Sequence, residues 1–257
     1  MHSIALDLGF IKIYWYSIFI LLAVICASLI IIKEAKRKKI DEDIMIDILF
    51  YGIIFAILGA RIYYVLFNLS YYLKYPLEIF AIWNGGLAIH GGIIGGLIVM
   101  MYMCKKHKMN IIKLLDIIAI GLILGQAIGR WGNFFNGEAY GTVVTLETLK
   151  SICIPNFIVN GMFIDGNYHH PTFLYESIWC FIGFIILFIN KNKFSEGKSL
   201  GFYLTWYGIG RLLIENLRTD SLMLLNIRIA QIVSLIFIII GIYYLLFYKE
   251  KSGGKHE

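Results

Sequence analysis

Seven apolar runs, each about 20 residues long, constrain the fold of this chain more than any other feature of its sequence. A helix of that length crosses the roughly 30 Å hydrocarbon core of a bilayer. The runs lie near residues 14–32, 44–67, 85–104, 111–128, 172–190, 199–217 and 226–248. We therefore predict an all-α integral membrane protein with about seven transmembrane helices, built as a single polytopic membrane domain over residues 1–257.

The composition supports this class and argues against several others. Only 16% of the residues are charged and 59% are hydrophobic, whereas soluble domains carry roughly 25% charged residues. The four cysteines show no paired spacing, so we expect neither a disulfide framework nor a zinc site. The net charge of +6 comes from short basic clusters beside apolar runs, a pattern typical of membrane-flanking charge. Nucleic-acid binding is not expected.

The distribution of lysine and arginine predicts the orientation of the spans, because short cytoplasmic loops carry an excess of these residues. Alternate connections and the C-terminal tail hold 15 of the 23 basic residues, namely Lys33, Lys36, Arg37, Lys38, Lys39, Lys105, Lys106, Lys108, Lys113, Lys191, Lys193, Lys198, Lys249, Lys251 and Lys255. We therefore predict that the N-terminus lies outside and the C-terminus is cytoplasmic.

With this orientation, several ionisable residues in the spans or just past one fall at a similar depth, toward the outer leaflet. They are Arg61, His90, Arg130, Arg211 and Glu215. Ionisable side chains at membrane depth are costly unless they face a cavity or one another. A single chamber that opens to the outer half of the bilayer is the working hypothesis.

Residues 129–141, GRWGNFFNGEAYG, are here called the signature segment, and they follow the fourth run directly. The segment holds Arg130, two asparagines, Glu138 and four glycines. A helix cap with a glycine-rich turn is the alternative interpretation, but a cap needs only one or two such side chains. We interpret the segment as a functional site. It also opens a predicted extracytoplasmic insertion at about 129–171, a small cap in which stretches such as 157–159 favour some β structure.

Glycines at a spacing of four residues predict close helix packing in the third and fourth runs. They are Gly91, Gly92, Gly95 and Gly96, then Gly121, Gly125 and Gly129. A role facing a ligand is the alternative for these glycines. We expect the packing to bring His90 and Arg130 onto neighbouring helices.

The arginines predict an anionic ligand, because a guanidinium group presents a fixed fork of donors to phosphate oxygens. Phospholipid headgroups are the anions available at this depth. Arg130 and Arg211 are the main candidates, with Arg61 and Arg218 as further ones. Glu215 follows Arg211 by four residues, so an intrahelical ion pair is the alternative for that duo. Glu176, in the fifth run, is expected to pair with a basic neighbour.

His90 has no neighbouring carboxylate or cysteine in the sequence, so no metal site is expected there. A lone histidine in a span often forms a hydrogen bond between helices, and it is also the usual proton acceptor near neutral pH. The sequence leaves both roles open. The chain contains no Gly-x-Ser-x-Gly motif, which argues against serine-hydrolase chemistry.

The signature segment resembles that of the bacterial prolipoprotein diacylglyceryl transferase family, and the order of five other motifs agrees. These motifs are IYWY at 13–16, GARIYYVLF at 59–67, WNGGLAIHGGIIGG at 83–96, HPTFLYE at 170–176 and YGIGRLLIENLRTD at 207–220. The resemblance covers essentially the whole chain.

The resemblance implies transfer of the diacylglyceryl group of phosphatidylglycerol to the lipobox cysteine thiol of a prolipoprotein signal peptide, with a thioether formed and glycerol phosphate released. It implies a multi-pass protein of the bacterial cytoplasmic membrane, with its active site toward the outer leaflet and no cofactor. His90 is the candidate base and Arg130 and Arg211 the candidate phosphate ligands. Substrate-binding or supporting roles are expected for Tyr16, Arg61, Asn133, Glu138, Gly141, Tyr207 and Glu215.

Two other classes of function compete with this enzyme. A lipid or anion transporter would use the same arginine chamber without chemistry, but it would need a second polar cluster near the cytoplasmic face, which we do not find in the sequence. A structural subunit of a membrane complex would not need the polar signature segment.

Overall fold

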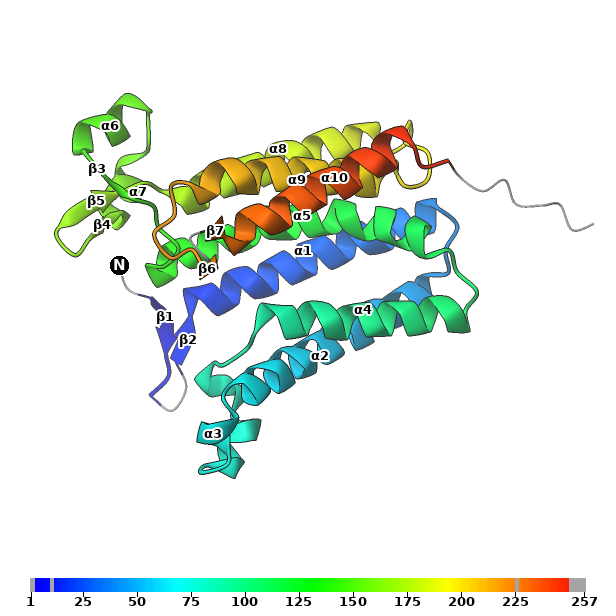
Figure 1. Ribbon diagram of the computed structural model, residues 1–257, viewed down its shortest axis with the longest axis horizontal. Coiled ribbons are helices and arrows are strands. Elements are labelled where there is room, and N and C mark those ends of the chain that lie inside the picture. Colours follow the sequence, from blue (N-terminus) through cyan, green and yellow to red (C-terminus); the bar gives the residue numbers. More distant parts are fainter. Residues whose placement is uncertain (1–2, 10–11, 225–226, 250–257) are drawn as a thin grey trace, which may run out of the picture. The chain divides into compact units, whose positions relative to one another are not determined.

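The computed structural model describes residues 3–9, 12–224 and 227–249, and this part of the chain is mostly helical (Figure 1). Within these residues each predicted apolar run overlaps one long helix. The long helices are α1 (Trp15–Arg37), α2 (Glu42–Phe67), α4 (Ile89–Lys106), α5 (Ile111–Asn136), α8 (Thr172–Asn190), α9 (Lys198–Glu215) and α10 (Ile229–Leu246). Lys251 and Lys255, which contributed to the predicted orientation, lie outside the described residues.

Five of the long helices are long and apolar enough to cross a membrane, namely α1, α2, α5, α8 and α10. Helix α9 carries three charged side chains, at Lys198, Arg211 and Glu215, and α4 carries His90, four glycines and two lysines. These residues lower the apolar character of α4 and α9. The count of seven spans and their orientation therefore stay predictions.

The chain folds into two compact units. One unit comprises Met1–Ile31 and Leu115–Glu257, and the other comprises Ile32–Leu114. We call them the large unit and the small unit. His90 and Arg61 belong to the small unit, whereas Arg130, Arg211 and Glu215 belong to the large unit. The predicted adjacency of His90 and Arg130 therefore stays a prediction.

Close glycine packing is confirmed for several of the predicted positions. In the small unit, a Cβ at Gly91 would overlap the carbonyl oxygen of Gly59 of α2, and a Cβ at Gly95 would overlap that of Phe55. In the large unit, a Cβ at Gly121 of α5 would come within 2.7 Å of the carbonyl oxygen of Ala27 of α1. Close backbone contact of this kind stabilises helix pairs in a bilayer, where the hydrophobic effect contributes little to helix association.

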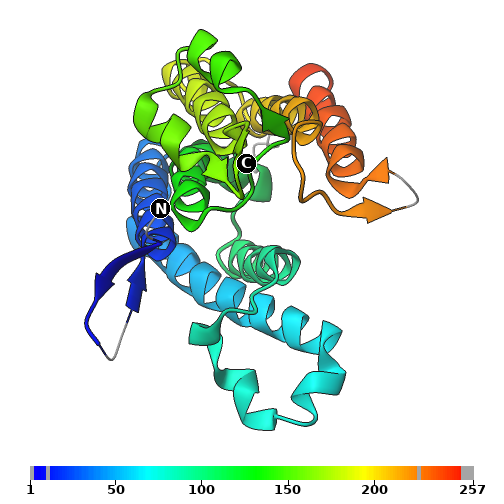
Figure 2. The same ribbon diagram turned by 90° about the vertical axis from the view of Figure 1, so that its left-hand side faces the viewer.

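The core of the large unit lies between α5, α8 and α9, and Figure 1 shows α9 beside α8 and α10. Its buried side chains come from all three of these helices: Ala119, Ile120, Ile123, Ala127, Cys180, Leu187 and Tyr203. Two small hairpins precede α1 and α10, as Figure 2 shows. They are formed by β1 (Ile4–Asp7) with β2 (Lys12–Tyr14), and by β6 (Met223–Leu224) with β7 (Ile227–Arg228).

The segment between α5 and α8 is a small mixed α/β cap. It contains α6 (Leu146–Ser151), α7 (Asn156–Gly161) and a three-stranded antiparallel sheet in the order β3 (Val143–Val144), β5 (Asn167–His169), β4 (Phe163–Ile164). Residues 157–159, expected to be β structure, lie instead in α7. Ile158 and Val159 are adjacent and both buried, which a helix starting at Asn156 permits and an alternating strand does not.

The cap begins later than the sequence predicts, because α5 continues through the first part of the signature segment to Asn136. Phe134 explains the extension, since its side chain is 1% exposed and packs with Ile158 and Met162 of the cap and with Phe173 of α8. Gly137, with a φ of +67°, ends the helix. Arg130 and Asn133 therefore project from a helix rather than from a loop.

Candidate functional site

Three arginines of the large unit converge on one carboxylate, that of Glu176 on α8. Arg130 Nη2 on α5 lies 2.6 Å from Glu176 Oε2, and Arg211 Nη1 on α9 lies 2.9 Å from Oε1. Arg218 Nη1, just after α9, lies 3.2 Å from the same Oε1. Glu176 is only 4% exposed. We call these four residues the arginine cluster.

Two further carboxylates balance the charge of the cluster. Glu215, which is fully buried, lies 2.8 Å from Arg211 Nη2, although the angles do not give a well-aligned hydrogen bond. The intrahelical ion pair, which the sequence left open as the alternative for these two residues, is thus present. Asp220 accepts two hydrogen bonds from Arg218, at 2.9 and 2.6 Å. Three positive charges therefore meet three negative ones, which keeps a buried charged cluster tolerable.

Two tyrosines of the predicted site line the same region. Tyr207, one turn before Arg211 on α9, interacts with the guanidinium of Arg130. Tyr16, at the start of α1, packs on α5, since a Cβ at Gly132 would come within 3.1 Å of its ring. Its hydroxyl interacts electrostatically with Glu138 and Arg130. Three helices thus supply groups around Arg130.

Near the end of the signature segment, two asparagine side chains bind the carboxylate of Glu138. Glu138 accepts hydrogen bonds from the amide groups of Asn133 and Asn136, each at 2.9 Å and each on a different oxygen. The backbone turns sharply here, because Gly137 and Ala139 both have positive φ angles. Glu138 is exposed and Asn133 is half-buried, so the turn presents a polar surface at the end of α5.

Gly141 joins three segments rather than offering a side chain. Its N–H donates to His170 O at 2.9 Å, its carbonyl lies 2.8 Å from His169 Nδ1, and it forms an isolated β-bridge with Arg218. A Cβ there would come within 2.7 Å of His170 Cβ and within 3.0 Å of the carbonyl oxygen of Leu217. Gly141 therefore fixes the approach of the Arg218 segment to the start of α8.

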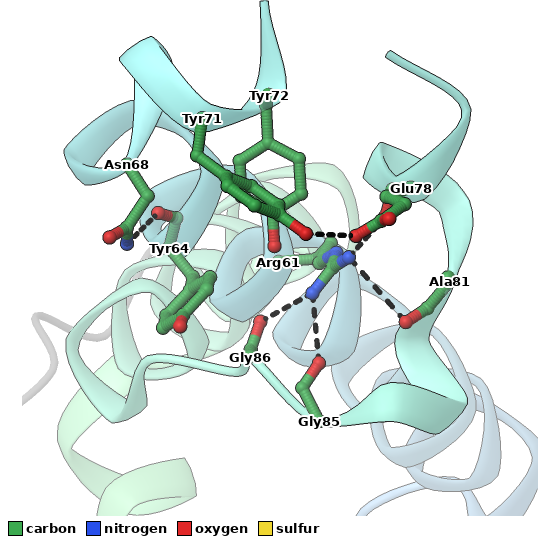
Figure 3. A pocket seen from close by; sticks show the side chains of 9 residues that line it. All are labelled: Arg61, Tyr64, Asn68, Tyr71, Tyr72, Glu78, Ala81, Gly85 and Gly86. Carbon is green, nitrogen blue, oxygen red and sulfur yellow. Dashed lines mark hydrogen bonds between the residues drawn. The ribbon is translucent and has the colours of Figure 1, made fainter. Parts of the chain in front are cut away.

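Arg61 organises the loop that follows α2 in the small unit. Its five guanidinium N–H groups donate at 2.5 to 3.5 Å to five backbone carbonyl oxygens, those of Glu78, Ile79, Ala81, Gly85 and Gly86. Figure 3 shows Arg61 beside Glu78, Ala81, Gly85 and Gly86. All its donors are thus used within the protein. This geometry favours a structural role for Arg61 over the predicted role in binding phosphate.

A cavity of about 450 Å³ lies beside Arg61, lined also by Tyr64, Tyr71, Tyr72 and Glu78 (Figure 3). The Arg61 guanidinium lies 5.3 Å from the ring centroid of Tyr72. Tyr71 donates a hydrogen bond of 2.7 Å to Glu78, and this bond raises the pKa of the Tyr71 hydroxyl.

His90 lies in the first turn of α4 and is exposed. Its ring centroid lies 5.8 Å from that of Tyr63 on α2. The imidazole is therefore accessible to a ligand in the small unit. Among the described residues, no three His, Cys, Asp or Glu side chains form a group that could hold a metal ion.

Glu176 is the main residue of the site for which the sequence predicted only a pairing with a basic neighbour. The available signal was a carboxylate within an otherwise apolar run, which is costly unless paired. The sequence could not show that three arginines from separate segments share it. Asn136 was also missed, although it lies within the signature segment and binds Glu138 as Asn133 does.

Comparisons with known proteins point to one family. A family model described as prolipoprotein diacylglyceryl transferase matches residues 3–247. A protein of Staphylococcus saprophyticus subsp. saprophyticus, named phosphatidylglycerol–prolipoprotein diacylglyceryl transferase, is 47% identical over 243 residues, which cover 94% of this chain and 87% of the relative. A protein of Streptococcus uberis with the same name is 48% identical over 256 residues, covering 98% and 97%.

Proposed function

The chain belongs to the prolipoprotein diacylglyceryl transferase family, and on that premise we propose how its residues carry out the reaction. It is an enzyme that transfers the diacylglyceryl group of phosphatidylglycerol to prolipoproteins. The acceptor in our proposal is the thiol of the lipobox cysteine in the signal peptide. Family membership favours an enzyme over a transporter or a structural subunit.

In the proposed reaction the cysteine sulfur, as thiolate, attacks the glycerol carbon that bears the phosphate ester. A carbon–sulfur bond forms while the carbon–oxygen bond breaks, and the electron pair leaves with the phosphate oxygen. The lipid phosphodiester carries one negative charge, and the departing glycerol phosphate gains a second. The enzyme must therefore lower the energy of negative charge that develops on the phosphate.

One observation carries the proposal, namely that Arg130, Arg211 and Arg218 converge on a single anionic group. A carboxylate and a phosphate both match the donor fork of a guanidinium. We infer that the lipid phosphate is bound by the same arginines that now hold Glu176. Tyr207 and Glu215 orient the two central arginines, since each contacts one of them.

The signature segment supplies the polar surface beside the cluster in this proposal. Asn133 and Glu138 are exposed or half-buried at the end of α5, and their amide and carboxylate groups suit the hydroxyls of a glycerol headgroup. Tyr16 packs against the same turn of α5. Gly141 contributes by fixing the backbone between the cap and Arg218.

His90 is the proposed base that accepts the thiol proton, because its ring is accessible at the start of α4. Activation of the thiol by the arginine cluster alone is the competing route. The proposed setting is the bacterial cytoplasmic membrane, crossed by seven spans with the N-terminus outside. In that orientation the arginine cluster and His90 face the outer leaflet, where the substrates meet.

The proposal is tested by incubating the purified protein with phosphatidylglycerol and a synthetic lipobox peptide. We expect the peptide to gain the mass of one diacylglyceryl group on cysteine, with an equal amount of glycerol phosphate released. A peptide with serine in place of cysteine is the matched control and should stay unmodified. The absence of both products in lipid nanodiscs would contradict the assignment.

A further inference from the structure

The position of Glu176 poses a problem for phosphate binding, because the carboxylate occupies the point on which the arginines converge. Its Oε1 contacts two of the arginines and its Oε2 contacts the third. The side-chain exposures of Arg130, Arg211 and Arg218 are 22%, 18% and 9%, so the donors face inward. A phosphate that bound to these three nitrogens would have to compete with Glu176 for them.

A second carboxylate of the large unit shows what a purely structural role looks like. Asp116 is also buried, and it accepts backbone hydrogen bonds from Gly197 N at 2.7 Å and Leu200 N at 2.8 Å, which cap the start of α9. The partners of Glu176 among the described residues are instead all arginine side chains. Arginine side chains can move and bind another anion, such as a phosphate. The backbone N–H groups that bind Asp116 are fixed by the helix.

The difference in charge between substrate and product explains why a competing carboxylate in the phosphate site would be useful. The lipid phosphodiester carries one negative charge, whereas a phosphate monoester carries about −1.5 to −2 near pH 7. An arginine cluster strong enough to bind the substrate would therefore hold the product more tightly. Release of glycerol phosphate would then limit turnover, as product release does in many enzymes.

We propose that Glu176 is a competing anion within the phosphate site. Its ion pairs with the arginines break when the lipid phosphate binds, and they form again as glycerol phosphate is displaced. The inference rests on the proposed function, since it requires that the arginine cluster binds the phosphate. Without Glu176, the three arginines of the cluster and the two carboxylates paired with them, Glu215 and Asp220, sum to one positive charge. Glu176 brings the sum to zero.

The isosteric change Glu176→Gln tests this role in the full-length protein. We expect glycerol phosphate to inhibit the variant at least tenfold more strongly than the wild type, because its competitor has lost its charge. The kcat and the KM for phosphatidylglycerol should fall together, since the product leaves more slowly. Glu147→Gln removes one exposed carboxylate from the cap as a matched control, and it should leave the inhibition constant unchanged.

A purely structural Glu176 would give the opposite pattern. Misplaced arginines would raise the KM and weaken inhibition by glycerol phosphate, and either weakened or unaltered inhibition in Glu176→Gln would overturn the inference. Binding of glycerol phosphate to Arg130→Gln separates this failure from failure of the proposed function. If Arg130→Gln binds it as tightly as the wild type, the phosphate site itself lies elsewhere.

A measurement on the wild type covers the case in which Glu176→Gln does not fold. Infrared difference spectra of the intact protein report a carboxylate that changes its partners. We expect glycerol phosphate to shift a carboxylate band, and Glu176→Asp should move that band and so assign it. A spectrum without any carboxylate change on saturation with glycerol phosphate would show that Glu176 keeps its arginines, and would overturn the inference.

Discussion

Trp179 and Trp206 exchange hydrogen bonds, since the indole N–H of each donates to the backbone carbonyl oxygen of the other, at 2.8 and 2.9 Å. Their rings stack with centroids 4.5 Å apart. A Cβ at Gly210 would overlap the Trp179 indole, and one at Gly183 would come within 2.5 Å of the Trp206 indole. This reciprocal pair fixes α8 against α9 in one register, three residues after Glu176 and five before Arg211.

We expect Trp179→Phe to loosen that register. The change keeps an aromatic ring but removes one of the two reciprocal hydrogen bonds, so it should lower the free energy of unfolding by about 1 kcal/mol. The kcat/KM should fall as the contact between Glu176 and Arg211 shifts. Thermal unfolding in detergent and the lipobox-peptide assay measure the two effects. Trp83→Phe, at an exposed position, is the control, and equal behaviour of both variants would contradict the register role.

Arg130→Ala should reduce transfer by at least about a hundredfold, the scale seen when one donor to a developing anion is removed. The protein should stay folded, because Glu176 keeps Arg211 and Arg218 as partners. Activity and thermal unfolding are measured side by side, with Lys150→Ala on the exposed cap surface as the charge-matched control. Retained activity in Arg130→Ala would move the phosphate site away from the cluster.

His90→Gln should lose most of its activity at pH 7 and recover part of it at higher pH. An unperturbed thiol has a pKa near 8.5, so the ionised fraction of the peptide cysteine rises about 25-fold between pH 7 and pH 9. The ratio of wild-type to variant rates should shrink over this range. Initial rates across the range measure it. A ratio that does not change with pH would favour activation by the arginine cluster.

Gly141→Ala should both destabilise the protein and slow transfer. A methyl group would meet His170 Cβ and the carbonyl oxygen of Leu217, and overpacking of this kind costs about 1–3 kcal/mol. Because Gly141 bridges to Arg218, the Arg218 contact with Glu176 should weaken as well. Gly52→Ala, where a Cβ meets open space, is the control for the change itself. Comparable activity in the two variants would argue against the bridging role.

The sequence predicts the helices of this protein well, because apolar runs of spanning length have few alternative structures. It failed where burial of particular side chains decided the outcome. The polar signature segment was predicted to begin the extracytoplasmic insertion. Its first part instead continues α5 to Asn136, because Phe134 is buried against the cap. Residues 157–159 were predicted to form β structure, but Ile158 and Val159 lie on the buried side of a helix.

The candidate site shows the same limit. The pairing of Arg211 with Glu215 follows from their spacing and is confirmed at 2.8 Å. The convergence of Arg130, Arg211 and Arg218 on Glu176 joins three helical segments, and no local spacing encodes it. Arg61 was grouped with the phosphate ligands because its residue type suggests an anion, whereas its donors bind main-chain carbonyls.

Arg61 has a consequence for how the loop after α2 tolerates variation. The arginine recognises five residues of the loop only through their carbonyl oxygens, which every amino acid possesses. A change of side chain at Ile79 should therefore leave its bond to Arg61 intact, whereas a Cβ at Gly86 would come within 2.6 Å of Arg61 Nη1. The guanidinium itself has no equivalent among the other side chains. Loss of Arg61 would thus release five main-chain carbonyl groups of this loop at once.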